Sequence, residues 1–164
     1  MSMNQALALA ADPGGPPVTP PGDMIEIDTR FGRFALPRAN TIVMPQGVLG
    51  FSNYHEFALL ALPDPRFARF RILQCLAEPA LSFIVVPHNL DDCGIDQADV
   101  TEALTALGVA SQDAVLLLIV TIRKAEGQVD MTVNMRAPIV LDVTRQSARQ
   151  YVLSNTRYSI RQRL

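Results

Sequence analysis

The chain has 164 residues, of which 49% are hydrophobic and 18% charged, and its net charge is −2. This composition is typical of one soluble domain that can bury a core without disulfides or metals. It argues against nucleic-acid binding through bulk charge, and no apolar run reaches the roughly 18 residues of a membrane span.

The first 22 residues are small, apolar or proline, and they contain no Lys or Arg. The PGGPPVTPPG stretch at their end suits neither a helix nor a sheet, so we expect a disordered tail over residues 1–22 and a folded domain over residues 23–164. A secretory signal would begin with positive charge, and the two cysteines have the isolated spacing of thiols in a reducing compartment. We therefore expect a cytoplasmic protein.

Short strands are predicted wherever apolar and polar residues alternate between turn residues. Gly32 has the position of a tight turn or bulge, and Pro45-Gln46-Gly47 has the order of a type II turn with proline at its second position. The strands predicted over residues 70–76 and 81–86 form a hairpin, and Pro87 ends its second strand. The predicted strands are residues 24–28, 34–36, 41–44, 57–62, 70–76, 81–86, 150–153 and 158–160.

The most strongly patterned stretch is residues 114–143. An apolar, β-branched run over residues 115–122 precedes a polar, glycine-containing bend, and alternating residues follow over residues 131–136. This order predicts a β-hairpin whose first arm is covered on both faces and whose second arm has one wet face. Pro138 interrupts the second arm before it resumes at residues 139–141.

One helix is predicted over residues 97–107, with Asp96 as its cap and Gly108 as its stop. Many short strands with one or two short helices predict an all-β, mainly antiparallel domain, either a small barrel-like fold or a sandwich. The apolar residues of the helix share one face at helical spacing: Val100, Ala103, Leu104 and Leu107.

No pattern of catalytic or metal-binding residues is visible. His55 and His88 have no carboxylate or cysteine at ligand spacing, and neither a G-x-S-x-G elbow nor a phosphate-binding glycine loop occurs. Cys93 follows two aspartates, whose charge raises the pKa of a thiol and disfavours a reactive thiolate. We therefore expect no enzyme activity, no metal and no cofactor.

Charge is unevenly distributed from residue 78 to the C-terminus. Residues 78–113 contain seven acidic residues and no Lys or Arg, whereas residues 143–164 contain five arginines and no acid. One interpretation is solvated faces together with the acids that are usual at a helix start. The other is an acidic surface for a basic partner and a separate arginine-rich contact. Composition leaves both open.

Several segments are similar, in order and spacing, to the FliW family of flagellar assembly factors, across roughly residues 23–164. MTVNMRAPIV over residues 131–140 is the most specific of them. The chain differs from the family pattern at Gln46, where glutamate is frequent, at Ile72, where an aromatic residue is frequent, and in having no tryptophan. The remaining segments are TRFG (29–32), MPQGVLGF (44–51), LSFIVV (81–86) and LLIVTI (117–122).

The resemblance implies a small barrel-like β-fold that binds proteins and catalyses nothing. Family members bind the translational regulator CsrA away from its RNA groove and antagonise its repression of flagellin messenger RNA. They also bind flagellin, so flagellin occupancy sets how much regulator is free. Our hypothesis is that the acidic region repels RNA phosphate near the bound regulator. The alternative is a flagellin-specific chaperone without regulator binding.

Three groups of residues are candidates for partner contacts. They are the acids of the predicted helix, the Pro-Gln-Gly turn with its neighbouring aromatic residue, and the polar residues of the second hairpin arm that face outward if the methionines face inward. The aromatic residue beside the turn is a candidate flagellin contact, although core packing also explains it. The candidates are Asp96, Asp99, Glu102, Gln46, Phe51, Thr132, Asn134 and Arg136.

Overall fold

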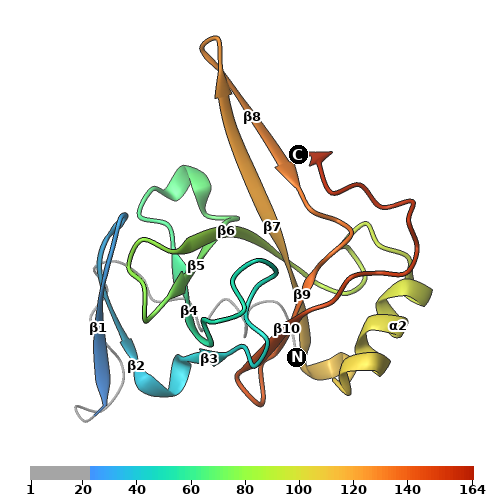
Figure 1. Cartoon of the computed structure of the whole chain (residues 1–164), viewed down its shortest axis with the longest axis horizontal. Coiled ribbons are helices and arrows are strands. Elements are labelled where there is room, and N and C mark those ends of the chain that lie inside the picture. The colour runs from blue at the N-terminus through green and yellow to red at the C-terminus, as the bar shows by residue number, and fades with distance from the viewer. Residues whose placement is uncertain (1–22) are drawn as a thin grey trace.

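The computed structural model describes residues 23–164, so the tail predicted over residues 1–22 lies outside the described residues. The described part consists of a nine-stranded sheet, a separate two-stranded hairpin, one α-helix and three short 3₁₀ helices (Figure 1). The prediction of an all-β, mainly antiparallel fold is confirmed. No helix among residues 23–164 is long and apolar enough to cross a membrane.

The elements agree closely with the predicted ones in the first two thirds of the chain. The strands are β1 (Met24–Thr29), β2 (Gly32–Pro37), β3 (Ile42–Val43), β4 (Glu56–Ala61), β5 (Arg71–Cys75), β6 (Ser82–His88), β7 (Ala114–Ala125), β8 (Gln128–Val133), β9 (Ile139–Asp142), β10 (Ser147–Gln150) and β11 (Gln162–Arg163). The helices are α2 (Gln97–Leu107) and the 3₁₀ helices η1 (Arg38–Asn40), η2 (Pro65–Phe67) and η3 (Ser111–Asp113).

The large sheet closes on itself through its longest strand, β7. The strand order is β11-β8-β7-β6-β5-β4-β3-β10-β9, and β9 pairs with β7 as well as with β10. Leu117 of β7 lies opposite Ile139 of β9, and Ile122 lies opposite Met131 of β8. The second arm of the predicted hairpin therefore does resume after Pro138, as β9. The parallel pairing of β3 with β10 completes the ring.

Alternate residues of each strand separate an inner core from an outer face. Phe57 and Leu59 of β4 belong to the inner cluster, together with Leu73 of β5 and Leu117 of β7. Their neighbour Leu60 belongs instead to a cluster on the outer face. Because both faces of these strands are buried, their sequences are continuous apolar runs rather than alternating ones.

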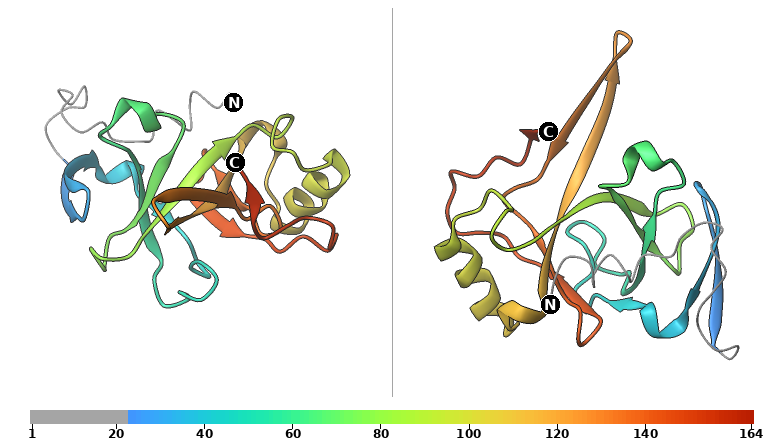
Figure 2. Two further views of the ribbon diagram at one scale, coloured as in Figure 1. Left: turned by 90° about the horizontal axis from the view of Figure 1, so that it is seen from above. Right: turned by 180° about the vertical axis from the view of Figure 1, so that it is seen from behind.

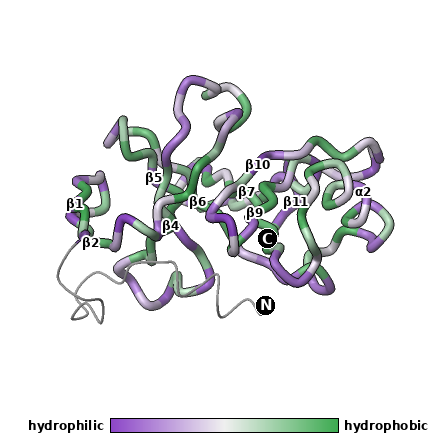
Figure 3. Tube along the Cα trace, turned by 90° about the horizontal axis from the view of Figure 1, so that it is seen from below, coloured by the Kyte–Doolittle hydropathy of each residue, from purple (hydrophilic) through white to green (hydrophobic). Residues whose placement is uncertain are grey.

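Two separate elements cover the outer face of the ring. The β1–β2 hairpin packs Phe34 and Leu36 against Ala58 and Ile72 of β4 and β5. Helix α2 and the C-terminal segment form a second cluster over β7 and β9. Figure 2 shows these two covers at opposite ends of the molecule, and Figure 3 shows the hydrophobic β6 between them.

Helix α2 has the predicted limits. Asp96 is its N-cap residue, and Gly108 ends it in the left-handed conformation, with φ of 66°. Val100, Ala103 and Leu104 are buried, as their spacing predicts. Asp96 makes no side-chain capping hydrogen bond, because its carboxylate pairs with Arg157 instead.

The prediction that the first hairpin arm is covered on both faces is wrong beyond Val120. Residues 121–125 are exposed, because this half of β7 projects from the body with β8 as a two-stranded arm (Figure 1). Pro87 does not end β6, which continues to His88. The β5 ladder ends opposite Val85, so Pro87 lies where β6 has a free edge and a missing amide donor is tolerated.

The two strands predicted nearest the C-terminus are also misplaced. The structure has strands at Ser147–Gln150 and Gln162–Arg163 rather than at residues 150–153 and 158–160. Tyr151 and Leu153 donate their amides to the carbonyls of Pro138 and Arg136, at 2.9 Å each, but no ladder forms. This segment is held mainly by its side chains.

Candidate functional site

Helix α2 and the C-terminal segment are joined by a network of polar side chains. Asp99 Oδ2 accepts from the Tyr158 hydroxyl at 2.6 Å and from the Asn155 side-chain amide at 3.0 Å. Glu102 accepts from the Tyr151 hydroxyl at 2.8 Å and from the Ser154 hydroxyl at 2.7 Å. Two of the three acidic candidates therefore stabilise the fold.

These hydrogen bonds favour the charged carboxylates. The Tyr158 hydroxyl, the Asn155 amide and the nearby Arg157 lower the pKa of Asp99 below its ordinary value. Ser154 and Tyr151 likewise lower the pKa of Glu102. Both residues remain anionic in their bonded positions well below neutral pH.

The third acidic candidate, Asp96, pairs with Arg157. The acidic region and the arginine-rich terminus, which the sequence left as two separate surfaces, therefore meet at this point. Asp91 and Asp92, by contrast, are exposed, and within residues 23–164 no hydrogen bond or ion pair engages their carboxylates. They can therefore face a partner without breaking internal bonds.

The Pro-Gln-Gly turn is held by close backbone packing. The Gly47 amide donates to the Met44 carbonyl at 3.0 Å, and Gly47 rather than Gln46 has the positive φ, of 62°. The turn is therefore not of type II, which needs positive φ at the Gln46 position. Gln46 is exposed, so its side chain is accessible to a partner.

Phe51 lies in the loop after this turn. Its side chain is 40% exposed, and its ring packs edge-on against Phe83, with centroids 5.3 Å apart and an angle of 73°. Phe51 therefore has one packed side and one open side. Both interpretations of Phe51, as core and as contact, keep a structural basis.

The MTVN-x-x-API block forms the corner between β8 and β9. Asn134 Oδ1 accepts the amides of Arg136 at 3.0 Å and of Ala137 at 3.1 Å, so Asn134 holds the turn. Both Asn134 and Arg136 are half-buried. The prediction that Thr132 faces outward is wrong, because it is only 9% exposed.

The burial of Thr132 follows from strand pairing. Thr132 lies opposite Thr121 of β7 and opposite Arg163 of β11. Directly opposed residues share a face of the sheet, so these two side chains flank Thr132 on both sides. The sequence did not predict β11, the strand that pairs with β8 beside Thr132.

The sequence model of the FliW protein family matches residues 26–164. The chain belongs to the FliW family. Its predicted family membership is thereby confirmed over nearly the whole described chain.

Individual FliW proteins are similar over most of their length. The flagellar assembly factor FliW of Geobacter sulfurreducens is 36% identical over 133 residues, which are 80% of this chain and 80% of that protein. FliW of Geobacillus sp. strain WCH70 is 31% identical over 150 residues, 85% of this chain and 95% of that protein. A crystal structure of the flagellar assembly factor FliW matches with a TM-score of 0.67 at 30% identity, over 85% of this chain and 96% of that one.

The histidines and cysteines of this FliW-family chain have ordinary structural environments. His55 Nδ1 lies 3.2 Å from the Met44 carbonyl oxygen, and His88 Nδ1 lies 3.0 Å from that of Asp92. Both cysteines are free and buried, and burial raises the pKa of the Cys93 thiol, with smaller contributions from the adjacent aspartates. Within residues 23–164 no group of His, Cys, Asp or Glu side chains is arranged to hold a metal ion.

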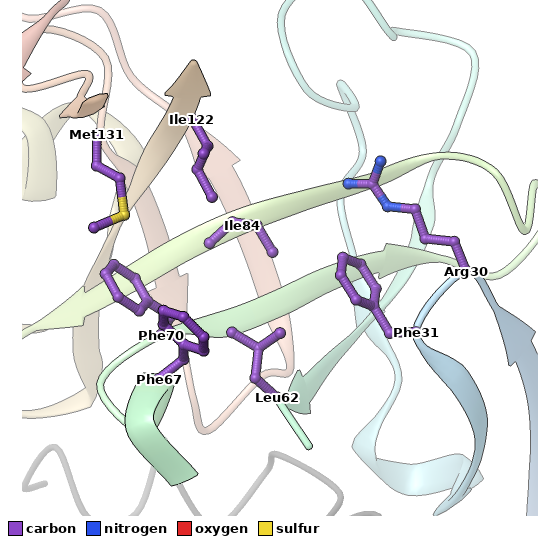
Figure 4. A pocket seen from close by; sticks show the side chains of 8 residues that line it. All are labelled: Arg30, Phe31, Leu62, Phe67, Phe70, Ile84, Ile122 and Met131. Atoms are coloured by element: carbon purple, nitrogen blue, oxygen red, sulfur yellow. The ribbon is translucent and has the colours of Figure 1, made fainter. Parts of the chain in front are cut away.

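Sequence reasoning missed an apolar pocket of about 420 Å³ on the outer face of the sheet (Figure 4). Its lining comes from four separate places: the β1–β2 turn, the η2 loop, β6 and the β7–β8 arm. The one signal in the sequence is that several of its apolar residues stand beside arginines, as in Arg30-Phe31 and Arg69-Phe70. Sequence alone does not bring these separate pairs together.

Proposed function

We propose that this protein is a cytoplasmic flagellar assembly factor that binds a CsrA-type translational regulator and also binds flagellin. Flagellin that occupies the protein would leave the regulator free to repress flagellin messenger RNA, so translation would follow the supply of flagellin. The match of the FliW family model to residues 26–164 is the observation that supports this proposal. The protein acts by binding rather than by catalysis, and it contacts no nucleic acid directly.

The structure limits which acidic residues are available for a contact with the regulator. Asp99 and Glu102 use their carboxylates within the protein, and Asp96 pairs with Arg157. Asp91 and Asp92 precede α2 and are exposed, so they are better placed to provide negative potential toward a basic partner.

The internal bonds of the α2 carboxylates also favour a second candidate function. If the acids of α2 serve only to hold the C-terminal segment, the protein could bind flagellin as a chaperone without binding the regulator. The two functions differ in one measurable property, which is affinity for the regulator.

The deciding experiment is a calorimetric titration of the purified protein with the CsrA-type regulator and, separately, with flagellin. A third titration adds flagellin to a mixture of protein, regulator and labelled target RNA, and follows RNA binding by anisotropy. We expect the protein to release RNA from the regulator and flagellin to restore RNA binding. Binding of flagellin alone would establish the chaperone, and binding of neither partner would refute both functions.

The electrostatic contribution to regulator binding is tested with variants that leave the fold intact. Asp91→Lys with Asp92→Lys changes exposed charge only, and we expect weaker regulator binding with a flatter salt dependence. Charge reversal at Asp96, Asp99 and Glu102 should also weaken binding, but it additionally breaks the bonds to the C-terminal segment, so its unfolding free energy must be measured alongside. Regulator affinity that is unchanged in both variants from low to moderate salt would exclude the acidic contact.

A further inference from the structure

Beyond Val120, strand β7 has a free edge. Its ladder with β6 ends at the pair of Ile84 with Val120, whereas its ladder with β8 continues from Val120 to Ala125. Residues 121–125 therefore have β8 on one side and, within residues 23–164, no strand on the other. All of them are exposed, and Figure 1 shows this half of β7 projecting away from β6.

The hydrogen-bonding pattern of β7 shows which backbone groups face this free edge. In an antiparallel pair, residues alternate between directing both backbone groups at the partner strand and directing both away from it. The Asn134 amide donates to the Ile119 carbonyl at 2.9 Å, so the β7 residues with odd numbers face β8 along this ladder. The amide and carbonyl of Ile122 and of Lys124 therefore point to the open side, in line with Val120, which pairs with β6.

An exposed row of unpaired backbone groups is usually blocked by a proline, a bulge, a covering segment or charged side chains. Residues 121–125 contain no proline, and they pair with β8 without a bulge. Charge is the blocking device present among them, in Arg123 and Lys124. This edge therefore rejects a strand that carries cations but accepts one that carries carboxylates.

Neither cation is neutralised by the rest of the described chain. Asp130 lies opposite Arg123 on β8, but its carboxylate pairs with Arg163 instead, at 3.3 Å. Lys124 lies opposite Val129, which offers no charge. A second copy of β7, paired antiparallel about Arg123, would place this residue against itself, and directly opposed like charges destabilise a sheet. The edge therefore favours a foreign strand with carboxylates over self-association.

The apolar pocket on the outer face of the sheet adjoins the free edge. Ile122 lines the pocket and is 48% exposed, and Ile84 lies in its middle, where β6 and β7 diverge (Figure 4). Side chains of directly opposed residues share a face of the sheet. A residue opposite Ile122 on an added strand would therefore project on the pocket side, so an apolar side chain is favoured at that position.

We propose that the free edge of β7 accepts an extended acidic segment of a protein partner as an added antiparallel strand. The backbone of this segment bonds to Ile122 and Lys124, an apolar side chain opposite Ile122 covers part of the pocket, and carboxylates lie opposite Arg123 and Lys124. The proposal rests on the proposed function only in that the segment belongs to a protein that this chain binds.

Amide hydrogen exchange of the full chain, measured by NMR, tests the free edge first. The Arg123 amide faces β8 and should be protected, whereas the amides of Ile122 and Lys124 should exchange at least about tenfold faster. Equal protection of the three amides would show that the edge is already covered in the full chain, for example by residues 1–22, and would overturn the proposal.

The added strand is tested with a fluorescein-labelled peptide whose core is Thr-Glu-Glu-Val-Thr, which places its valine opposite Ile122 in antiparallel pairing. We expect saturable binding by anisotropy, together with selective protection of the Ile122 and Lys124 amides. N-methylation at the valine and at the first glutamate removes the peptide amides that face β7, and it should weaken binding about tenfold or more. N-methylation at the second glutamate, whose amide points away from β7, is the matched control and should weaken binding far less.

Variants of the chain separate backbone pairing from charge. Lys124→Pro removes an amide that β8 does not use, so the protein should fold but bind the peptide at least about tenfold more weakly than Lys124→Ala does. The N-methylated peptides give the same test on the unaltered protein. Arg123→Glu with Lys124→Glu should reject the peptide and bind instead a counterpart with two lysines in place of its glutamates.

Three results overturn the added strand. These are the absence of saturable peptide binding, binding that Lys124→Pro and every N-methylation leave unchanged, and equal binding of the glutamate and lysine peptides by the unaltered chain. The titrations with regulator and flagellin are independent of these peptide results. If neither protein binds, the proposed function fails while peptide binding at the β7 edge stands, and if the peptide alone fails to bind, only the added strand is refuted.

Discussion

The Tyr158 hydroxyl donates to Asp99 Oδ2 over 2.6 Å, across a separation of 59 residues. The same hydroxyl oxygen accepts from the Asp96 amide at 2.9 Å and from the Arg157 guanidinium at 3.1 Å. The Tyr158 ring is buried among the residues that α2 packs on. One side chain therefore satisfies an amide at the start of the helix and anchors the C-terminal segment to it.

Removing this hydroxyl should destabilise the protein measurably. Tyr158→Phe leaves the Asp96 amide and the Asp99 carboxylate without this partner, so we expect a loss of about 1–2 kcal/mol in the free energy of unfolding. Urea denaturation followed by circular dichroism measures the loss. Tyr54→Phe is the matched control, because no hydrogen bond engages the Tyr54 hydroxyl within the described chain. Equal midpoints for the two variants would contradict the role given to Tyr158.

The same network predicts how stability depends on pH. The pKa values of Asp99 and Glu102 are lowered in the folded state, by Tyr158 and Asn155 and by Ser154 and Tyr151 respectively. The unfolded chain therefore binds protons more readily. This contribution is fully present above the unfolded pKa values of about 3.9 and 4.3, and it is lost as pH falls through the folded values.

Urea midpoints measured from pH 7 to pH 3 test this dependence. We expect the Asp99→Asn, Glu102→Gln double variant to be less stable than wild type at pH 7 and to lose less further stability on acidification. Asp91→Asn serves as the control, and its curve should run parallel to that of wild type. A double variant as sensitive to acid as wild type would assign the acid sensitivity to other groups.

Local patterns were enough to predict most of the fold. The apolar run and alternation in residues 114–143 predicted the β7–β8 hairpin, and the spacing of Val100, Ala103 and Leu104 predicted α2 with its Gly108 stop. In α2 and in β7 up to Val120 the sequence period matches the burial pattern that the fold imposes. Local and tertiary preferences agree there, which is the condition under which reading a sequence succeeds.

Apart from the type of the Pro45-Gln46-Gly47 turn, which is a local error, the clearest errors depend on distant segments. Tyr151 and Leu153 alternate as in a strand, but their partners are a corner at residues 136–138 and an α-helix rather than another strand. The sequence predicts a solvated or partner-binding face for the acids of α2. In the structure the C-terminal segment packs on this face and bonds to Asp99 and Glu102. Similarly, the alternation of residues 131–136 predicts an outward-facing Thr132, but β11 pairs beside it and Thr132 is buried. No local period encodes these contacts.

The turn at Gly47 should tolerate no side chain. Its φ is 62°, and an added Cβ would lie 2.9 Å from the Ser52 Cα and the Tyr54 carbonyl oxygen, which are backbone atoms that cannot move aside cheaply. Gly47→Ala should cost more than about 2 kcal/mol, since the clash adds to the roughly 1 kcal/mol of a strained φ. Gly50→Ala isolates the second effect, because Gly50 has φ of 87° with no atom within 4 Å of an added Cβ. Chemical denaturation of both variants gives the difference, and equal losses would show that the close packing at Gly47 is relieved by small shifts.

The final prediction concerns Asn134, which is both a candidate partner contact and the residue that holds the β8–β9 corner. Asn134→Ala removes the acceptor of the Arg136 and Ala137 amides, so we expect a loss of about 1–3 kcal/mol in the free energy of unfolding. Asn134→Asp keeps an acceptor oxygen in the same place and should retain most of that stability.

Partner affinity separates the two roles of Asn134. If Asn134 acts only through the corner, folded Asn134→Asp protein should bind flagellin and the regulator as wild type does in calorimetric titration. A stable Asn134→Asp variant with strongly reduced affinity would show instead that the side-chain amide contacts a partner directly, since the aspartate retains the acceptor but lacks the amide donor.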